Sequence, residues 1–339
     1  LLAGLAVVLA LNVSALAAEK DYATCIGKDI EPDKRIAACT PIAKDTTEVT
    51  RIRVVAYFYR GVAWDDRQDQ DRAIADYSEA IALDPKQASP YINRGADWYD
   101  KGDNDRAIAD FNAAISLEPS SSDAYSSRGA AFLRKGKTDA AILDFQQAIE
   151  ADPSNGKAHA GLGIAWDRKN DLVRAVAEYD EAIRIDPQDA IVYINRGIAR
   201  AAKGEFDPAI ADYDVALGLD PENADAYANR GAAWLGKNDW IRAISDTSKA
   251  IELDAAGIDG YYYRAVAWAS KGNNDRAIAD FDRAIALDAN YARAYFGRSL
   301  VRTRRGDATG AAADCRQAIE LDPKMAGCCD TGPVGAKAP

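Results

Sequence analysis

Hydrophobic and polar positions along residues 89–119 follow the period of two consecutive helices. In the first half, Tyr91, Gly95 and Trp98 recur at i, i+4 and i+7, which places them on one helix face. In the second half, apolar residues share one side of another helix: Ala107, Ile108, Phe111, Ala114 and Ile115.

The turn between these two helices is marked by its polar residues. Gly102 ends the first helix, since glycine accepts the left-handed conformation that follows a helix end. We expect Asp105 to cap the second helix through its side-chain oxygen, and Pro119 to stop it. The segment is therefore predicted to be a helical hairpin.

The same pattern returns every 34 residues from Val54 to Met325, without an insertion. One position of the first helix is small in every unit: Gly61, Gly95, Gly129, Gly163, Gly197, Gly231, Ala265 and Ser299. Twelve residues later every unit has Ala, from Ala73 to Ala311. Tandem units of this length predict stacked hairpins, each burying its apolar faces against its neighbours.

Through these spacings, residues 54–325 resemble the tetratricopeptide repeat family. The resemblance implies an all-α fold, a right-handed α-solenoid of about eight 34-residue helix-turn-helix repeats. It also implies that the concave face binds a protein or peptide. The predicted repeats are 54–87, 88–121, 122–155, 156–189, 190–223, 224–257, 258–291 and 292–325.

The segments outside the repeats carry different signals. Residues 1–17 are mostly apolar and end in a signal-peptidase-like Ala-Leu-Ala, so we expect a removed export signal, with a retained anchor as the alternative. Residues 18–53 are predicted to be a degenerate cap, and residues 326–339 a disordered tail. These features favour an exported bacterial protein, periplasmic and free of the membrane after signal removal.

Cysteine occurs only near the two ends of the chain, which supports export to an oxidising compartment. We predict a disulfide between Cys25 and Cys39. Cys315 is a candidate to pair with Cys328 or Cys329, and the alternative is a small core residue. One thiol is left over, which leaves room for a homodimer through the spare cysteine.

An arginine stands directly before the small residue in seven of the eight units, and an aspartate follows it sixteen residues later. The exceptional unit has Leu162 and Glu178 at these two places. We interpret this as a ladder of Arg–Asp pairs that joins helices within or between units. The alternative is two solvated polar positions inherited by duplication.

Composition excludes several kinds of function. The net charge of the 339 residues is −11, which argues against nucleic acid and disfavours anionic membrane surfaces. The one histidine, His159, takes a place that is Tyr in the other units, so a catalytic triad or a histidine-rich metal site is excluded. The acidic run at 65–71 lacks the Gly and distal Glu of a calcium loop. We expect no enzyme activity, no metal and no cofactor.

The groove is where the resemblance places binding residues. Asn93, Asn195 and Asn229 occupy a position that resembles the asparagine ladder of repeat-bearing glycosyltransferases, and an amide can grip any peptide backbone. Apolar and aromatic residues on the same helices complete the predicted groove: Ile164, Ile191, Ile194, Ile198, Leu235, Tyr262, Tyr263 and Phe296. The alternative is that these side chains only pack neighbouring units.

The sequence thus predicts a non-catalytic scaffold that binds a protein or peptide in its concave groove. Two alternatives remain. One is a self-associating structural protein of the cell envelope, and the other is an accessory subunit of a separate enzyme. The partner itself is not identified by any residue pattern.

Overall fold

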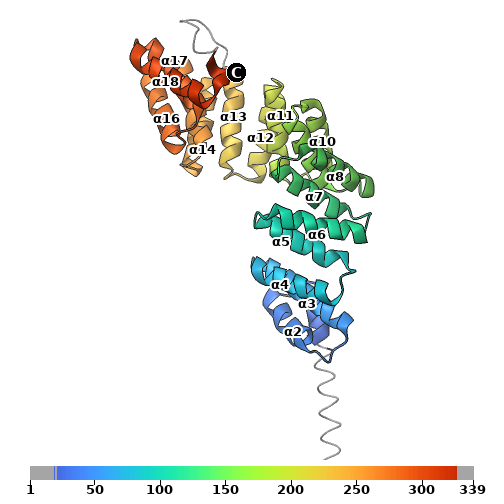
Figure 1. The fold of residues 1–339 in the computed structure, drawn as a ribbon. Coiled ribbons are helices and arrows are strands. Elements are labelled where there is room, and N and C mark those ends of the chain that lie inside the picture. The colour runs from blue at the N-terminus through green and yellow to red at the C-terminus, as the bar shows by residue number, and fades with distance from the viewer. Residues whose placement is uncertain (1–18, 20, 327–339) are drawn as a thin grey trace, which may run out of the picture. The chain divides into compact units, whose positions relative to one another are not determined.

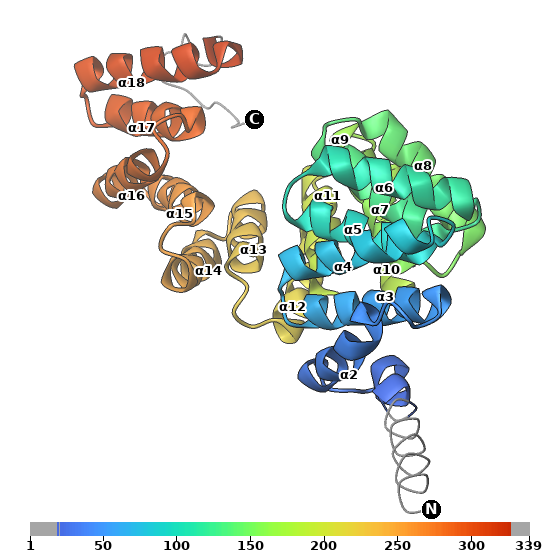
Figure 2. The ribbon, with the colours of Figure 1, turned by 60° about the horizontal axis from the view of Figure 1, so that its bottom comes forward.

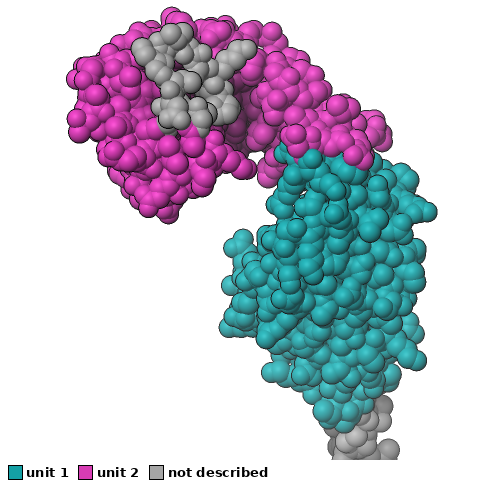
Figure 3. Space-filling model, turned by 45° about the horizontal axis from the view of Figure 1, so that its top comes forward, with its two compact units in different colours: residues 1–169 teal, residues 170–339 magenta. Residues whose placement is uncertain are grey.

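The computed structural model describes residue 19 and residues 21–326. All regular secondary structure in that part of the chain is helical, which confirms the predicted all-α repeat fold. The chain divides into two compact units, residues 1–169 and 170–339 (Figure 3). The predicted signal sequence lies outside the described residues, as does the predicted tail beyond Ala326.

In the first unit, helices that follow one another in the chain pack against each other (Figure 1). The helices are α2 (Pro32–Lys44), α3 (Thr50–Asp66), α4 (Gln70–Leu83), α5 (Ala88–Asp100), α6 (Asn104–Leu117), α7 (Ser122–Arg134), α8 (Thr138–Ala151) and α9 (Gly156–Arg168). The first helices of consecutive repeats also touch, as α5 touches α7.

The second unit repeats this arrangement, and Figure 2 shows its later hairpins stacked one after another. Its elements are α10 (Leu172–Ile185), α11 (Ala190–Ala202), α12 (Phe206–Leu219), α13 (Ala224–Gly236), α14 (Trp240–Leu253), α15 (Ile258–Ser270), α16 (Asn274–Leu287), α17 (Ala292–Arg304), α18 (Ala308–Leu321) and the 3-10 helix η1 (Pro323–Met325). The division between the units falls inside the fourth predicted repeat, between α9 and α10.

The turn before α6 shows how each second helix starts. Gly102 adopts a φ of 82°, which confirms its predicted role in ending α5. The side chain of Asp103 then accepts a hydrogen bond from the backbone N–H of Arg106 at 3.1 Å. The prediction that Asp105 caps this helix is therefore wrong. Asp105 lies in the first turn and forms an ion pair with Lys135.

Small residues let the two helices of a repeat approach closely. A Cβ atom placed on Gly95 would lie 2.7 Å from the ring of Phe111, which is fully buried. Ala107 is fully buried in the same cluster, and Trp98 packs against its edge. The core thus contains a line of small residues, which face a large ring in most repeats and Thr247 in the sixth.

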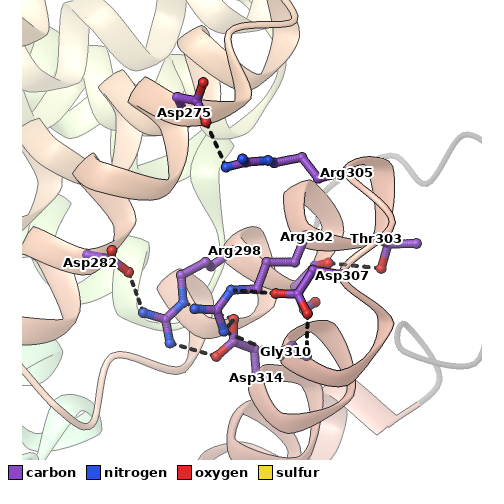
Figure 4. Close-up of polar contacts among 10 residues, drawn as sticks. Asp275, Asp282, Arg298, Arg302, Thr303, Arg305, Asp307, Gly310 and Asp314 are labelled. Carbon is purple, nitrogen blue, oxygen red and sulfur yellow. Dashed lines mark hydrogen bonds and ion pairs between the residues drawn. The ribbon is translucent and has the colours of Figure 1, made fainter.

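The Arg–Asp ladder is confirmed, and it joins helices both within and between repeats. Arg298 on α17 donates from Nε and Nη2 to Asp314 on α18, at 2.8 and 2.6 Å, and from Nη1 to Asp282 on α16, at 2.5 Å (Figure 4). Seven such pairs occur in the part of the chain that the structure describes: Arg60–Asp76, Arg94–Asp110, Arg128–Asp144, Arg196–Asp212, Arg230–Asp246, Arg264–Asp280 and Arg298–Asp314.

These aspartates are not the solvated positions of the alternative interpretation. Their side chains are only 4–11% exposed. Each guanidinium also lies near the ring of the tyrosine three residues earlier, as Arg298 does over Tyr295 at 5.5 Å. A guanidinium group that donates two hydrogen bonds to one carboxylate and lies against an aromatic ring is held in one orientation. The pairs therefore fix how the helices of each repeat align with each other.

The disulfide predicted between Cys25 and Cys39 is present, with a Cα–Cα distance of 4.9 Å. It joins the helical segment 21–26 to α2. Both cysteines are fully buried beside Val54 and Tyr57 of α3, so the segment before the first repeat continues the packed core.

Cys315 on α18 is disulfide-bonded as well. Its two predicted partners, Cys328 and Cys329, lie outside the described residues. The bond shows that Cys315 is more than a small core residue.

Replacing Cys25 and Cys39 together by Ala is expected to lower the free energy of unfolding of the first unit by about 2 kcal/mol. The bond closes a loop between residues 14 apart in sequence and so restricts the unfolded chain. Urea denaturation followed by far-ultraviolet circular dichroism measures the change. An unchanged midpoint would show that the bond adds no stability to the cap.

Candidate peptide-binding surface

The eleven residues predicted to line a groove fall in both units. Asn93 on α5 and Ile164 on α9 belong to the first unit, and the other nine belong to the second. Asn93 donates from Nδ2 to the hydroxyl of Tyr77 at 3.2 Å, so its amide already has a partner. Ile164 is half-buried against the core of α7 to α9. The candidate surface is therefore built from the second unit.

Helix α11 presents an open stripe made of Ile191, Asn195 and Ile198, named here the α11 stripe. The helix starts at Ala190 because the Asp189 side chain caps it. Asp189 accepts hydrogen bonds from the first backbone N–H groups, the shortest at 3.0 Å from Ile191. Ile191 and Ile198 are 64% and 36% exposed. Among the described residues, the Asn195 side chain makes no hydrogen bond. The stripe thus offers two apolar side chains and a free amide to a ligand.

Asn229 on α13 occupies the same register as Asn195, one repeat later, and α13 packs against α11. Its Nδ2 donates to the backbone carbonyl of Asp225 at 2.9 Å, one turn earlier on the same helix. This bond leaves the amide oxygen available as an acceptor. Leu235, two turns further along α13, is half-buried.

Three of the predicted groove residues are buried: Ile194, Tyr262 and Phe296, at 7–8% exposed. Tyr262 meets the rings of Phe281 and Tyr291 at 6.0 and 5.5 Å between centroids. For these three side chains the packing alternative holds, and they do not contribute an open wall. Tyr263 is half-buried beside Tyr262, and burial raises the pKa of its phenol.

A recess of about 350 Å³ lies between α13, α15 and the loops that precede α15 and α17. Four carboxylates and a phenol are among its lining residues: Asp225, Asp254, Asp259, Asp288 and Tyr291. The Tyr291 hydroxyl donates to Asp259 at 3.0 Å, and burial raises the pKa of that phenol. We name it the acidic recess. It was not identified from the sequence, because its carboxylates come from three separate segments of the chain.

Other chemistry is limited in the residues that the structure describes. His159 is buried on α9, in the position that is Tyr elsewhere. Within residues 21–326, no group of His, Cys, Asp or Glu is arranged to hold a metal ion. In the same range, no helix has the length and apolar character needed to span a bilayer.

A tetratricopeptide repeat model matches residues 94–155, 131–190 and 259–326, and a second model for the same repeat matches residues 199–238. Together they cover more than half of the 339 residues. No curated protein matches the chain in sequence.

Several solved structures share the fold. A chain of the APC/C hetero-tetramer Cut9–Hcn1 matches 93% of this chain with a TM-score of 0.63 and 16% identity, and this chain covers 62% of its length. A tetratricopeptide repeat protein from Parabacteroides merdae matches 73% of this chain, with 98% of its own length covered, a TM-score of 0.56 and 16% identity.

PilF of Pseudomonas aeruginosa matches 60% of the chain, with 92% of its own length covered, a TM-score of 0.52 and 24% identity. At such identities the likeness concerns the fold. The period, the helix pairs, the family models and these structures agree, and the chain belongs to the tetratricopeptide repeat family.

Proposed function

We propose that this chain is a non-catalytic scaffold that binds an extended peptide segment of a partner protein along α11 and α13. Proteins with this repeat typically mediate protein–protein interaction. The observation that carries the proposal is the α11 stripe beside Asn229. Ile191 and Ile198 are exposed on α11 on either side of Asn195. Asn229 occupies the equivalent position on α13, which packs against α11.

The two amides suit a peptide backbone. A side-chain amide can donate to a backbone carbonyl and accept from a backbone N–H, so it holds a chain of any sequence. Ile191 and Ile198 add contacts to apolar side chains of that peptide. Asn195 has no competing partner among the described residues, and Asn229 keeps its oxygen available.

Charge favours a basic peptide. The chain carries a net charge of −11, and the acidic recess lies one turn from Asn229 along α13 through Asp225. A lysine or arginine side chain beside the backbone contact would meet those carboxylates. Such long-range attraction acts mainly on the association rate and weakens with added salt.

Replacing Asn195 and Asn229 together by Ala is expected to weaken peptide binding by about tenfold to a hundredfold. Each lost amide contact is worth about 1 kcal/mol, and about 1.4 kcal/mol corresponds to tenfold in affinity. Peptides selected from a displayed random library on the full chain provide the probe, and fluorescence anisotropy measures their dissociation constants. Capture from a bacterial envelope fraction then identifies the natural partner.

Two substitutions serve as matched controls. Asn290→Ala removes an exposed amide from the loop before α17, and Val215→Ala trims an apolar side chain that is 43% exposed on α12. Both should leave the affinity unchanged, while Ile191→Ala with Ile198→Ala should lower it. Equal affinity in the double asparagine variant and the original chain would exclude these residues from the binding surface.

We further propose that the protein works in an oxidising compartment, the bacterial periplasm. The buried disulfide between Cys25 and Cys39 supports this, since such bonds persist outside the cytosol. Alkylation of free thiols in protein taken directly from a periplasmic extract tests it. Protection of both cysteines is expected, and labelling of both would contradict the assignment.

A further inference from the structure

Asp97 is an unusual residue at its place in the repeat. It lies on α5, is 5% exposed, and stands two residues after the small position of the second repeat. The other seven repeats carry a small apolar residue there: Ala63, Ala131, Ala165, Ala199, Ala233, Ala267 and Val301. A buried carboxyl group in a column of alanines needs a polar partner.

That partner is Asp65 on α3, the first helix of the preceding repeat. The carboxyl groups of Asp97 and Asp65 are close enough to act on each other directly. Tyr77 on α4 donates its hydroxyl hydrogen to Asp65 Oδ2 at 2.5 Å, and Asn93 on α5 donates to the Tyr77 oxygen at 3.2 Å. The carboxyl pair thus ends a chain of hydrogen bonds that runs through the contact between the first two repeats.

Two carboxyl groups can share a hydrogen bond only if one of them carries the proton. Asp65 Oδ1 and Asp97 Oδ2 are both buried, and neither has a donor while both groups are ionised. A proton on Asp97 supplies the missing donor to Asp65. One proton shared by the two groups would therefore satisfy both buried oxygens.

The surrounding charges act in the same direction. Asp66 and Asp100 face the pair and disfavour further negative charge. Lys101, which favours the charged form of Asp97, is paired with Asp71 at 3.0 Å. Burial, and then the charge of Asp65, raise the pKa of Asp97 to about 8. Burial also raises the pKa of Asp65.

We propose that Asp65 and Asp97 bind one proton between them and form a proton-dependent contact that holds the first repeat against the second. The contact lies in the first unit, so it is independent of the peptide surface proposed for α11 and α13. When the proton is lost, two like charges remain in a buried site, and separation of α3 from α5 becomes more favourable.

The expected pH dependence has a definite sign. The pKa of Asp97 is higher in the folded protein, about 8, than its ordinary value near 3.8. The stabilisation is complete below the ordinary value and is lost as the pH rises towards 8. Opening of the contact should increase by up to about tenfold per pH unit between pH 5 and 7.5, and level off above about 8.

Hydrogen exchange of the full chain measures this opening. Exchange rates of α3 and α5 amides, corrected for intrinsic chemistry, should follow the stated dependence in the original protein. Asp97→Asn keeps a donor towards Asp65 and removes the titration, so its corrected opening should be flat with pH. Asp100→Asn removes one of the negative charges that face the pair, so the dependence should remain but level off at a lower pH than in the original protein.

An independent readout separates a shared proton from a merely structural role. The infrared spectrum of the original protein at pH 6 should contain a protonated-carboxyl band that is absent in Asp97→Asn and in Asp97→Ala. Asp97→Ala introduces the residue that six other repeats have at this position. It therefore provides the same test if the asparagine variant does not fold. A flat profile in the original protein, or an unchanged profile in Asp97→Asn, would overturn the proposal.

Discussion

Replacing Asp144 by Asn should lower the free energy of unfolding of the first unit by about 3–5 kcal/mol. The Asp144 side chain is 7% exposed and accepts from Nε and Nη2 of Arg128, both at 2.7 Å. This bond raises the pKa of Arg128, so the guanidinium stays charged after the substitution. It would then be left half-desolvated without its counter-charge. Urea denaturation of the variant and the original chain measures the difference.

The matched control removes both partners together. Arg128→Leu with Asp144→Leu should come within about 1 kcal/mol of the original protein, because replacing a whole buried pair by apolar residues is often neutral. The next repeat supports this expectation, since Leu162 stands at the arginine position and is 3% exposed in a packed core. A loss below about 1 kcal/mol in Asp144→Asn would mean that water reaches the pair and screens it.

An exposed ion pair shows how little stability such a contact contributes when water surrounds it. Lys249 and Glu252 lie 2.8 Å apart with side chains 39% and 70% exposed. Lys249→Ala should change stability by less than about 0.5 kcal/mol. The contrast shows that the sequence spacing of the Arg–Asp pairs does not by itself determine how much each pair contributes to the free energy of unfolding. The spacing of sixteen residues would be the same for a buried pair and for a solvated one, so the burial of these pairs is known only from the structure.

Most of the fold followed from the repeat period. A small residue, an alanine twelve places on and a turn with one residue in the left-handed conformation recur without insertion, so one hairpin predicted all the others. Helix starts were less certain, because Asp103 and Asp105 both precede apolar residues of α6. Both are good cap residues, and only the backbone shows that Asp103 holds the cap.

The candidate surface was predicted less completely, for a physical reason. Alignment with the repeat family shows which residues lie on the first helix of a repeat. Whether such a residue is buried depends on the side chains of the neighbouring repeat that pack against it. Ile191 and Ile198 are open while Ile194, between them, is buried by the turn of the helix. The carboxyl pair of Asp65 and Asp97 was visible only as one exception in a column of alanines. That Asp97 lies beside Asp65 could be known only from the contact between the first two repeats.

Replacing Gly197 by Val is expected to lower the free energy of unfolding of the second unit by about 3 kcal/mol. A Cβ atom on Gly197 would lie 2.7 Å from the ring of Tyr213, which is 1% exposed. Extra carbon atoms in such a packed site force side chains and backbone to shift. The seventh repeat has Ala265 facing Phe281, so a single methyl group is tolerated in a sister hairpin. Valine adds two further carbons and a branch that is unfavourable in a helix.

Gly218 on α12 is the control within the same repeat. No atom lies within 4 Å of a Cβ placed there, its φ is not in the left-handed region, and the residue is exposed. Gly218→Ala should therefore stabilise the protein by up to about 1 kcal/mol through helix propensity alone. Thermal and urea unfolding of both variants should move in opposite directions. If Gly197→Val matched Gly218→Ala, close approach of α11 and α12 would not be what requires glycine at this position.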